Sequence, residues 1–452
     1  MMGPHDVRLD PELAQRLARR AAALAPLGSL SSDIVMLAPE QAAALQRLAE
    51  RLAGTYPYGE PHYVGQMLKP PHPLAWAAYA TAMLLNPNNH ALDGGPATAA
   101  MEEEAVAAIA AMFGYDEHIG HLTSSGTIAN LEALWVARES HPDEVILYGE
   151  NAHYTHARMC QLLGARAEQI RQDALGRLEL EALETRLRAG GVGTVVATLG
   201  TTSLGAIDRI EQIAELCSRH SARLHVDAAY GGFFALLADG AQPGVEGEPF
   251  AALRRADSIV VDPHKHGLQP YGCGCVLFAD PANARLYAHD SPYTYFTSRE
   301  RHLGEISLEC SRAGAAAAAL WTTLEALPLT REGLGTHLAA SRAAAQRLAH
   351  ALQEGDLALV AAPELDIVCP FARLERASQI SERSELAFDS LARAGWHVAK
   401  LRVATGWLRR THAEVEPDAD AVTTLRLVLM KPSHGGVVDQ LAAALREHLG
   451  GG

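Results

Sequence analysis

From residue 99 to residue 330 the hydrophobic positions of the chain alternate between two patterns. Stretches with apolar residues three or four positions apart predict helices with one buried face. Short runs of β-branched residues lie between them and predict buried strands. The predicted helices are Ala99–Phe113, Ile128–Arg138, His153–Leu163 and Ile210–His220, and the predicted strands are Val145–Tyr148, Gly193–Leu199, Arg223–Asp227, Ser258–Val261 and Gly274–Phe278. This order favours an α/β fold with a mostly parallel sheet covered by helices.

The flanking segments follow other patterns. Residues 10–53 predict two amphipathic helices that are broken around residues 28–32. The many prolines of residues 54–98 predict an irregular segment, and its aromatic and histidine content is typical either of a site or subunit interface or of a plain surface wrap. Beyond Pro328 we expect a helix to Leu352, strands near 357–360 and 366–371, a helix at Ser381–Ala394 and a strand at Thr424–Leu429. The expected domains are residues 1–98 (N-terminal helices and irregular arm), 99–330 (large α/β domain) and 331–452 (smaller α+β domain).

Composition narrows the class of protein. The 452 residues are 48% hydrophobic and 20% charged, which is typical of a globular protein. A net charge of -15, from 53 acidic and 38 basic residues, argues against a nucleic-acid partner. No apolar run of about 18 residues or more is present, so no membrane span is expected. The N-terminus also lacks an apolar signal core.

Cysteine usage points to the cytoplasm. The six cysteines form no regular framework, so we expect free thiols in a reducing compartment. Cys273-Gly-Cys275 is a weak metal signal without a second ligand pair, and buried strand thiols explain it better. No metal site is therefore expected.

The polar stretch His121–Asn130 is predicted to be a loop that opens a helix. Backbone N–H groups at a helix N-terminus, with the hydroxyls of Ser125 and Thr127, form a cradle for phosphate. On its own, such a stretch is usually a helix cap. A nucleoside triphosphate is disfavoured, because no lysine follows in P-loop spacing.

Two further stretches could contact a flat ring. His153, at the start of a predicted helix, can stack on an aromatic ligand, although alone it would read as a capping or surface histidine. Asp227 ends a predicted buried strand, where a carboxylate needs a cation or several donors. A protonated pyridine nitrogen is one such cation, and a metal or a structural salt bridge is the competing explanation. Small residues, Ala228, Ala229 and Gly231 among them, leave room for the ring.

Lys265, beside His264, follows the strand at residues 258–261. A semi-buried lysine near cationic groups has a lowered pKa, which imine chemistry requires. A phosphate cradle, a stacking imidazole, a buried aspartate and a reactive lysine together indicate pyridoxal 5'-phosphate (PLP). The combination is far more specific than any one of its members.

These stretches resemble the group II PLP-dependent amino-acid decarboxylases, which include aromatic-amino-acid, tyrosine and glutamate decarboxylases. The resemblance runs from about Pro61 to Arg426 and is carried by Ala152–Thr155, Ala197–Thr202, His225–Tyr230 and Asp262–Lys265. It implies fold type I, the aspartate-aminotransferase-like fold. It also implies that Lys265 holds PLP covalently, that His153 stacks on its ring and that Asp227 binds its pyridine nitrogen. The other implied cofactor-binding residues are Ser125, Gly126, Thr127, Thr198, Ala229 and His264.

The chain departs from this family in places. Many relatives have tryptophan after the lysine, whereas this chain has His266. The resemblance implies a catalytic tyrosine some 30 residues past the lysine, and Tyr293 is favoured over Tyr295 as this proton donor. If neither reaches the substrate carbon, oxidative deamination becomes an alternative. Arg312 resembles an arginine near the site or the neighbouring subunit, and Arg426 is either a carboxylate contact or simply a strand residue.

The expected function is therefore PLP-dependent decarboxylation of an L-amino acid to its amine, with a slight preference for an aromatic substrate such as tyrosine. A carbon–carbon lyase similar to sphingosine-phosphate lyase, an oxidative deaminase and an inactive scaffold are the alternatives. The resemblance also implies a homodimer with sites near the subunit interface.

Overall fold

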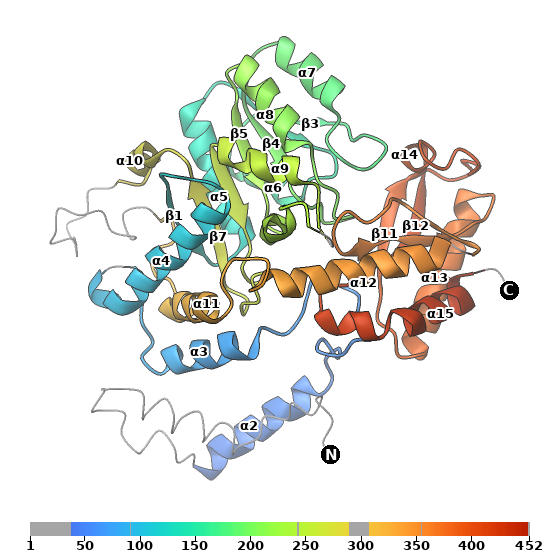
Figure 1. Cartoon of the computed structure of the whole chain (residues 1–452), viewed down its shortest axis with the longest axis horizontal. Helices are drawn as coiled ribbons and strands as arrows, with labels where there is room; N and C mark the ends of the chain where they lie inside the picture. The colour runs from blue at the N-terminus through green and yellow to red at the C-terminus, as the bar shows by residue number, and fades with distance from the viewer. Residues whose placement is uncertain (1–37, 91, 242–243, 289–306, 354, 451–452) are drawn as a thin grey trace.

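The alternating pattern of residues 99–330 forms a seven-stranded sheet in the computed structural model, with strand order β1-β7-β6-β5-β4-β2-β3 (Figure 1). The structure describes residues 38–90, 92–241, 244–288, 307–353 and 355–450. Strands β2 to β6 run parallel, and β7 pairs antiparallel with both β6 and β1. The strands are β1 (Ile119–Thr123), β2 (Val145–Gly149), β3 (Ala167–Ile170), β4 (Val192–Thr198), β5 (Arg223–Asp227), β6 (Ser258–Val261) and β7 (Gly274–Phe278). The mostly parallel α/β sheet is therefore confirmed.

Helices connect and cover these strands, and each predicted helix of this region is present (Figure 1). The small residues of α11 let it pack closely against α3 (Pro73–Met83) and α4. The helices are α4 (Pro96–Met112), α5 (Gly126–Ser140), α6 (Thr155–Leu163), α7 (Leu180–Arg188), α8 (Ile210–Arg219), α9 (Gly247–Ala251), α10 (Ala284–Tyr287) and α11 (Gly314–Ala326).

The C-terminal part contains a smaller sheet, ordered β11-β12-β9, beside the long helix α12 (Figure 1). A separate two-stranded sheet joins β10 and β8. The elements are α12 (Gly335–Gln353), β8 (Leu357–Leu359), β9 (Ile367–Val368), β10 (Pro370–Ala372), α13 (Ala377–Arg393), β11 (Ala399–Ala404), α14 (Thr405–Leu408), β12 (Ala421–Val428) and α15 (Val438–Leu449). The mixed α and β character expected here is present, and the domain boundaries at residues 98 and 330 stay a prediction.

The prediction that residues 54–98 lack regular structure is wrong in part. Helix α3 (Pro73–Met83) lies within them, and α4 begins at Pro96. Both prolines occupy the first turn of their helix, where the missing N–H would have no intrahelical partner and the fixed φ suits the helix. At the N-terminus, α2 (Pro39–Leu52) confirms the second of the two amphipathic helices, and the first lies outside the described residues.

The stretch at 121–130 also differs from the prediction. Residues 121–123 belong to strand β1, so only residues 124 and 125 form the loop before α5. Glycine and histidine inside β1 (Ile-Gly-His-Leu-Thr) hide the strand from a search for β-branched runs. Strand β3 was missed for a related reason, because this edge strand buries only Ile170.

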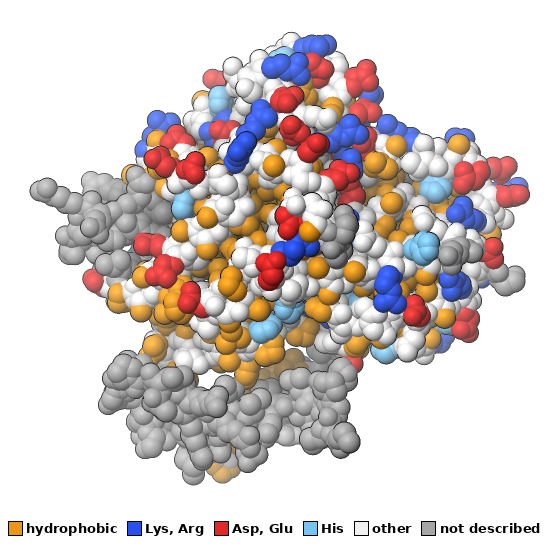
Figure 2. Space-filling view, in the orientation of Figure 1, with side chains coloured by type: hydrophobic (Ala, Val, Ile, Leu, Met, Phe, Trp, Pro, Cys, Tyr) orange, Lys and Arg blue, Asp and Glu red, His pale blue; other side chains and the backbone are white. Residues whose placement is uncertain are grey.

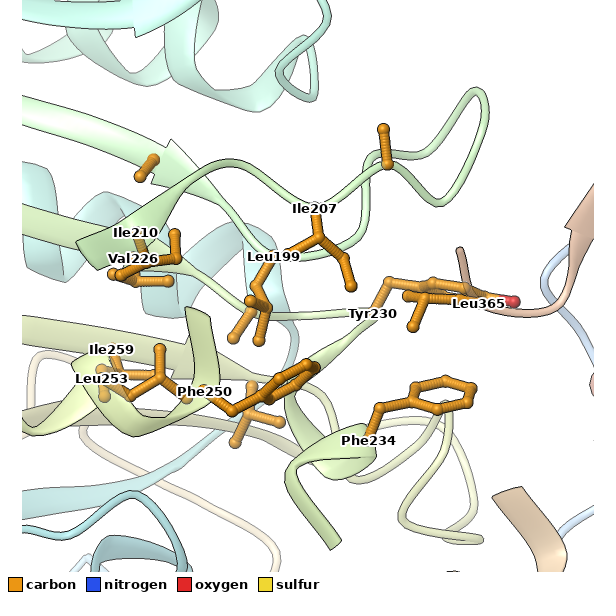
Figure 3. Packing of buried hydrophobic residues seen from close by; sticks show 14 of the residues in the cluster. Leu199, Ile207, Ile210, Val226, Tyr230, Phe234, Phe250, Leu253, Ile259 and Leu365 are labelled. Atoms are coloured by element: carbon orange, nitrogen blue, oxygen red, sulfur yellow. The ribbon is translucent and has the colours of Figure 1, made fainter. Parts of the chain in front are cut away.

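One hydrophobic cluster joins the central sheet to the C-terminal part. Leu199, at the end of β4, packs near Ile207 and Tyr230, and Leu365 reaches this cluster from the C-terminal part of the chain (Figure 3). Gly231 permits this close packing, since a Cβ there would lie 2.3 Å from the Leu199 carbonyl oxygen. Packing thus holds the segment before β9 against the loops after β4 and β5.

The surface carries both signs of charge. On the face shown in Figure 2, acidic and basic side chains are intermixed, and no broad basic patch is visible there. Among the described helices, none combines the length and hydropathy needed to cross a bilayer. All six cysteines are free thiols, and five of them are buried, including Cys273 and Cys275.

We expect Leu253→Ala to lower the free energy of unfolding of the apo-protein by about 2–5 kcal/mol, because it empties a fully buried site. Urea denaturation measures this loss. Leu386 is 60% exposed, so Leu386→Ala is the matched control and should change stability by less than about 0.5 kcal/mol. Equal losses for the two variants would contradict the assignment of the core.

Candidate active site

A cavity of about 200 Å³ opens where the carboxyl ends of β4, β5 and β6 meet the N-terminus of α5. Ligands of open α/β sheets bind at this edge. The structure brings together here the whole predicted set that it describes: Ser125, Gly126, Thr127, His153, Thr198, Asp227, Ala229, His264 and Lys265. Tyr293 and its alternative Tyr295 lie outside the described residues.

The N-terminus of α5 forms one wall of this cavity. Ser125 is the N-cap residue, and its hydroxyl accepts a hydrogen bond from the Ile128 N–H at 3.4 Å. A Cβ on Gly126 would lie 2.6 Å from the Asp262 carboxylate, so glycine is required at the first helical position. The free N–H groups of this first turn, with the Thr127 hydroxyl, suit an anion such as phosphate.

Asp227 presents a buried carboxylate from the end of β5, the central strand of the sheet. Its Oδ2 lies 2.9 Å from Nε2 of His156, and its Oδ1 accepts the Ala229 N–H at 3.1 Å. Burial alone would raise the pKa of Asp227, but the hydrogen bond and electrostatic interaction with His156, followed by the nearby Lys265 charge, outweigh it and hold the pKa below its usual range. Asp227 therefore stays ionised and can bind a cationic ring nitrogen.

His153 occupies the turn before α6. Its Nδ1 lies 2.8 Å from the Thr155 hydroxyl, which is 3.4 Å from the Thr127 hydroxyl. Burial lowers the pKa of His153, because the charged imidazole loses solvation. A neutral imidazole fixed in this way offers its face to the cavity.

Lys265 follows β6 in a tight turn, in which its N–H donates to the Asp262 carbonyl. Its Nζ lies 3.1 Å from Oδ2 of Asp262, a buried carboxylate. His264 donates from Nδ1 to the Cys273 carbonyl at 2.8 Å, and burial lowers the pKa of its ring. The reactive lysine thus has an ionic partner inside the cavity and a neutral imidazole beside it.

Sequence reasoning missed several residues that surround the site. Asn130, Thr155, Gly200, Thr202, Tyr230 and Asp262 also line the cavity. His156 hydrogen-bonds to Asp227 but does not line the cavity. Only the fold distinguishes it from an ordinary core histidine. The proximity of Asp262 to Lys265 follows from the turn after β6 and could have been inferred from their spacing.

His266 has a structural explanation. Its ring is fully buried, with Nε2 3.2 Å from Oδ2 of Asp366. The Tyr230 hydroxyl donates to Oδ1 of the same carboxylate at 2.5 Å. Asp366 directly precedes β9, so this charged contact links the cavity wall at Tyr230 to the C-terminal part of the chain.

The two arginines singled out in the sequence occupy different places. Arg312 pairs with Glu102 and donates to the Leu122 carbonyl, and it does not line the cavity. Arg426 is buried on β12, and its Nε donates to the Ser203 carbonyl at 3.2 Å. The Nη2 of Arg426 has no hydrogen-bond partner among the described residues. A buried guanidinium with a free N–H group is suited to an anionic ligand.

The aromatic residues of 54–98 do not line the cavity of the described chain. Tyr58 and Tyr63 form an edge-to-face pair at 5.1 Å, and Lys431 donates to the carbonyls of both. The stretch that contains Tyr58 and Tyr63 therefore packs on the C-terminal part of the same chain.

Comparisons with known proteins agree with this geometry. Residues 61–372 match the pyridoxal-dependent decarboxylase conserved domain. A probable L-tyrosine/L-aspartate decarboxylase of Methanothermobacter thermautotrophicus is 31% identical over 69% of this chain and 83% of its own length. An L-tyrosine decarboxylase of Enterococcus faecium is 29% identical over 72% of this chain and 69% of its own length.

Solved structures match almost the whole fold. The crystal structure of mouse CSAD covers 98% of this chain and 99% of its own, with a TM-score of 0.78 and 22% identity. That of Oryza sativa TDC with PLP and tryptamine covers 99% of this chain and all of its own (100%), with a TM-score of 0.79 and 18% identity. The likeness confirms fold type I.

The cavity residues fit PLP. The helix N-terminus at Gly126 suits its phosphate, the ionised Asp227 suits its ring nitrogen, and Lys265 Nζ faces the same space. PLP is the cofactor of the matching family, and one of the similar structures contains it.

We expect the apo-protein to lose stability as the pH falls from 7 to 5, in part through His225. Burial lowers the pKa of this residue to about 3, whereas an unfolded histidine titrates near about 6.5. Below the latter value the unfolded chain binds a proton that the folded chain excludes, which should cost about 2 kcal/mol at pH 5. Urea denaturation at pH 7 and pH 5 measures the loss of unfolding free energy between the two pH values. This loss should be smaller by about 2 kcal/mol in His225→Gln than in wild type. Equal losses in wild type and variant would contradict this assignment.

Proposed function

This chain belongs to the family of pyridoxal-dependent decarboxylases, and we propose that its substrate is an aromatic L-amino acid such as tyrosine. It is a PLP-dependent carboxy-lyase, which releases CO2 from an amino acid and leaves the amine. The observation that carries the assignment of site residues is the meeting of Lys265, Asp227 and His153 in one cavity at the strand ends.

Each cavity residue has a separate task in this proposal. Bound PLP supplies an electron sink for the pair released when the bond from Cα to the carboxylate breaks. Asp227 would accept a hydrogen bond from the ring nitrogen and balance its charge. The Ser125 and Thr127 hydroxyls and the first N–H groups of α5 would bind the phosphate. His153 would stack on the ring, and Lys265 would hold the cofactor covalently.

Asp262 and a tyrosine complete the handling of charge and protons. Asp262 lies 3.1 Å from Lys265 Nζ, so it can hold the ammonium group when the lysine is free. We assign the proton that returns to Cα to Tyr293, with Tyr295 as the alternative, on the resemblance alone. The product is the amine, whereas an oxidative deaminase would release ammonia and a carbon–carbon lyase would release an aldehyde without CO2.

An acidic substrate such as aspartate is the second candidate, and Arg426 is the observation that favours it. Its free Nη2 is buried beside the loop that contains Thr202 and Ser203. It could bind either the carboxylate shared by all substrates or a carboxylate on the side chain. The names of the relatives include both tyrosine and aspartate as substrates. Our choice of tyrosine as the substrate is based on the two matches to L-tyrosine decarboxylases and not on the aromatic residues of 54–98.

We further propose a cytoplasmic homodimer, as the resemblance implies. Helix α2 has three apolar side chains on one face, Leu45, Leu48 and Leu52, each about half exposed in the single chain. A subunit interface would cover such a face.

Lys265→Ala should abolish amine formation from every amino acid and remove the visible absorbance of the lysine-bound cofactor after gel filtration. The reason is that no other amine occupies its place in the cavity of the described chain. Lys400→Ala, on β11 and paired with Glu385, is the matched control and should retain both properties. Full amine production and retained absorbance in Lys265→Ala would refute the assignment of this lysine.

Arg426→Leu distinguishes the two substrate candidates. Rates of CO2 and amine release from tyrosine, DOPA, tryptophan, phenylalanine, glutamate, aspartate and diaminobutyrate should first identify the substrate. If Arg426 binds the shared carboxylate, the variant should raise KM for all accepted substrates by about tenfold or more. A loss confined to aspartate and glutamate would instead assign Arg426 to the side chain and favour the acidic substrate. Unchanged KM values would exclude both roles.

A further inference from the structure

His156 is a buried residue in direct contact with Asp227, and the proposed mechanism assigns it no task. It is the second residue of α6 and is fully buried behind Asp227, so it does not line the cavity. Its Nε2 lies 2.9 Å from Oδ2 of Asp227, which is a good hydrogen-bond distance. His156 can therefore reach the cofactor only through this carboxylate.

The surroundings of His156 determine which nitrogen bears the proton. Its Nδ1 is buried and has no hydrogen-bond partner among the described residues. A carboxylate accepts hydrogen bonds but does not donate them, so Nε2 is the nitrogen that carries a proton toward Asp227.

The other polar rings near His156 do not replace it. His225 lies 6.2 Å away between ring centroids, and its two nitrogens bond to Asn130 and Ser258. Tyr148, on β2, lies 6.3 Å from His156 between ring centroids. Among the described residues, Asp227 is thus the carboxylate that forms an ion-pair contact with His156.

We propose that His156 is a positioning residue for the cofactor, which acts by donating a hydrogen bond to Asp227. This inference rests on the proposed role of Asp227 as partner of the PLP ring nitrogen. This hydrogen bond fixes the orientation of the carboxylate that the ring nitrogen would meet. Each oxygen of Asp227 then has one donor from the protein, His156 for Oδ2 and the Ala229 N–H for Oδ1, and keeps a lone pair for the cofactor.

Two variants of the full-length protein test this proposal. His156→Gln keeps an N–H donor of similar reach, and His156→Phe keeps a ring but removes the donor. The readout is the dissociation constant of PLP for the apo-protein, from absorbance and tryptophan fluorescence, with the pH dependence of the visible spectrum. We expect His156→Phe to weaken PLP binding by about tenfold or more and to alter the spectral pH profile. His156→Gln should stay within about threefold of wild type and keep the profile.

His121→Phe is the matched control, because His121 Nε2 lies 3.0 Å from buried Glu132 and neither residue lines the cavity. It should lower the melting temperature but leave PLP affinity within about threefold of wild type. Should His156→Phe not fold, which circular dichroism will reveal, His156→Leu takes its place against His156→Gln.

The proposal is overturned if the variant without a donor binds PLP as tightly as wild type. It is equally overturned if the glutamine variant loses as much affinity as the phenylalanine variant, or if His121→Phe weakens binding to the same extent. Failure of the proposed function looks different, since Lys265→Ala would then keep the visible absorbance of bound PLP whatever the variants of His156 do.

Discussion

The ion pair proposed between the buried Asp227 and a cationic ring nitrogen is the interaction on which this account depends. A carboxylate at the end of the central strand loses its hydration, which is costly unless donors and a positive charge replace the water. The protein supplies two hydrogen-bond donors to this carboxylate, His156 and the Ala229 N–H. In the proposed function the negative charge of Asp227 would help bound PLP to accept electrons.

The fold places the other groups around this charge by the geometry of a parallel sheet. Strands β4, β5 and β6 end at the same edge, so Thr198, Asp227 and the turn that holds Lys265 meet although they are far apart in the chain. The antiparallel pair β1 and β7 extends the sheet. Helix α5 follows β1 in the chain, so its N-terminus lies at the same cavity. The C-terminal part is fastened to this edge by Leu365 and by the contacts of Asp366 with Tyr230 and His266.

Much of the fold and the site could be predicted because the signals are local. Buried parallel strands appear in the sequence as runs of β-branched residues, and several residues proposed to bind the cofactor directly follow those runs. The misses have physical causes: β1 contains glycine and histidine, β3 is a polar edge strand, and Pro73 begins a helix rather than preventing one. His156 and Asp366 could not be assigned from the sequence, because a buried histidine or aspartate gains its meaning from a partner that only the fold brings near. The substrate could not be predicted from the sequence for the same reason, because the buried guanidinium of Arg426 lies on a strand far along the chain from Lys265.

The most direct test of the central claim is the rate of decarboxylation by Asp227→Asn at saturating PLP. Asparagine keeps the size of the side chain and can still contact the ring nitrogen, but it has no charge with which to hold that nitrogen protonated. The account predicts that PLP remains bound while kcat falls by at least about a hundredfold, as is typical when a charge that stabilises a transition state is removed. A variant with PLP bound and kcat close to that of wild type would contradict it.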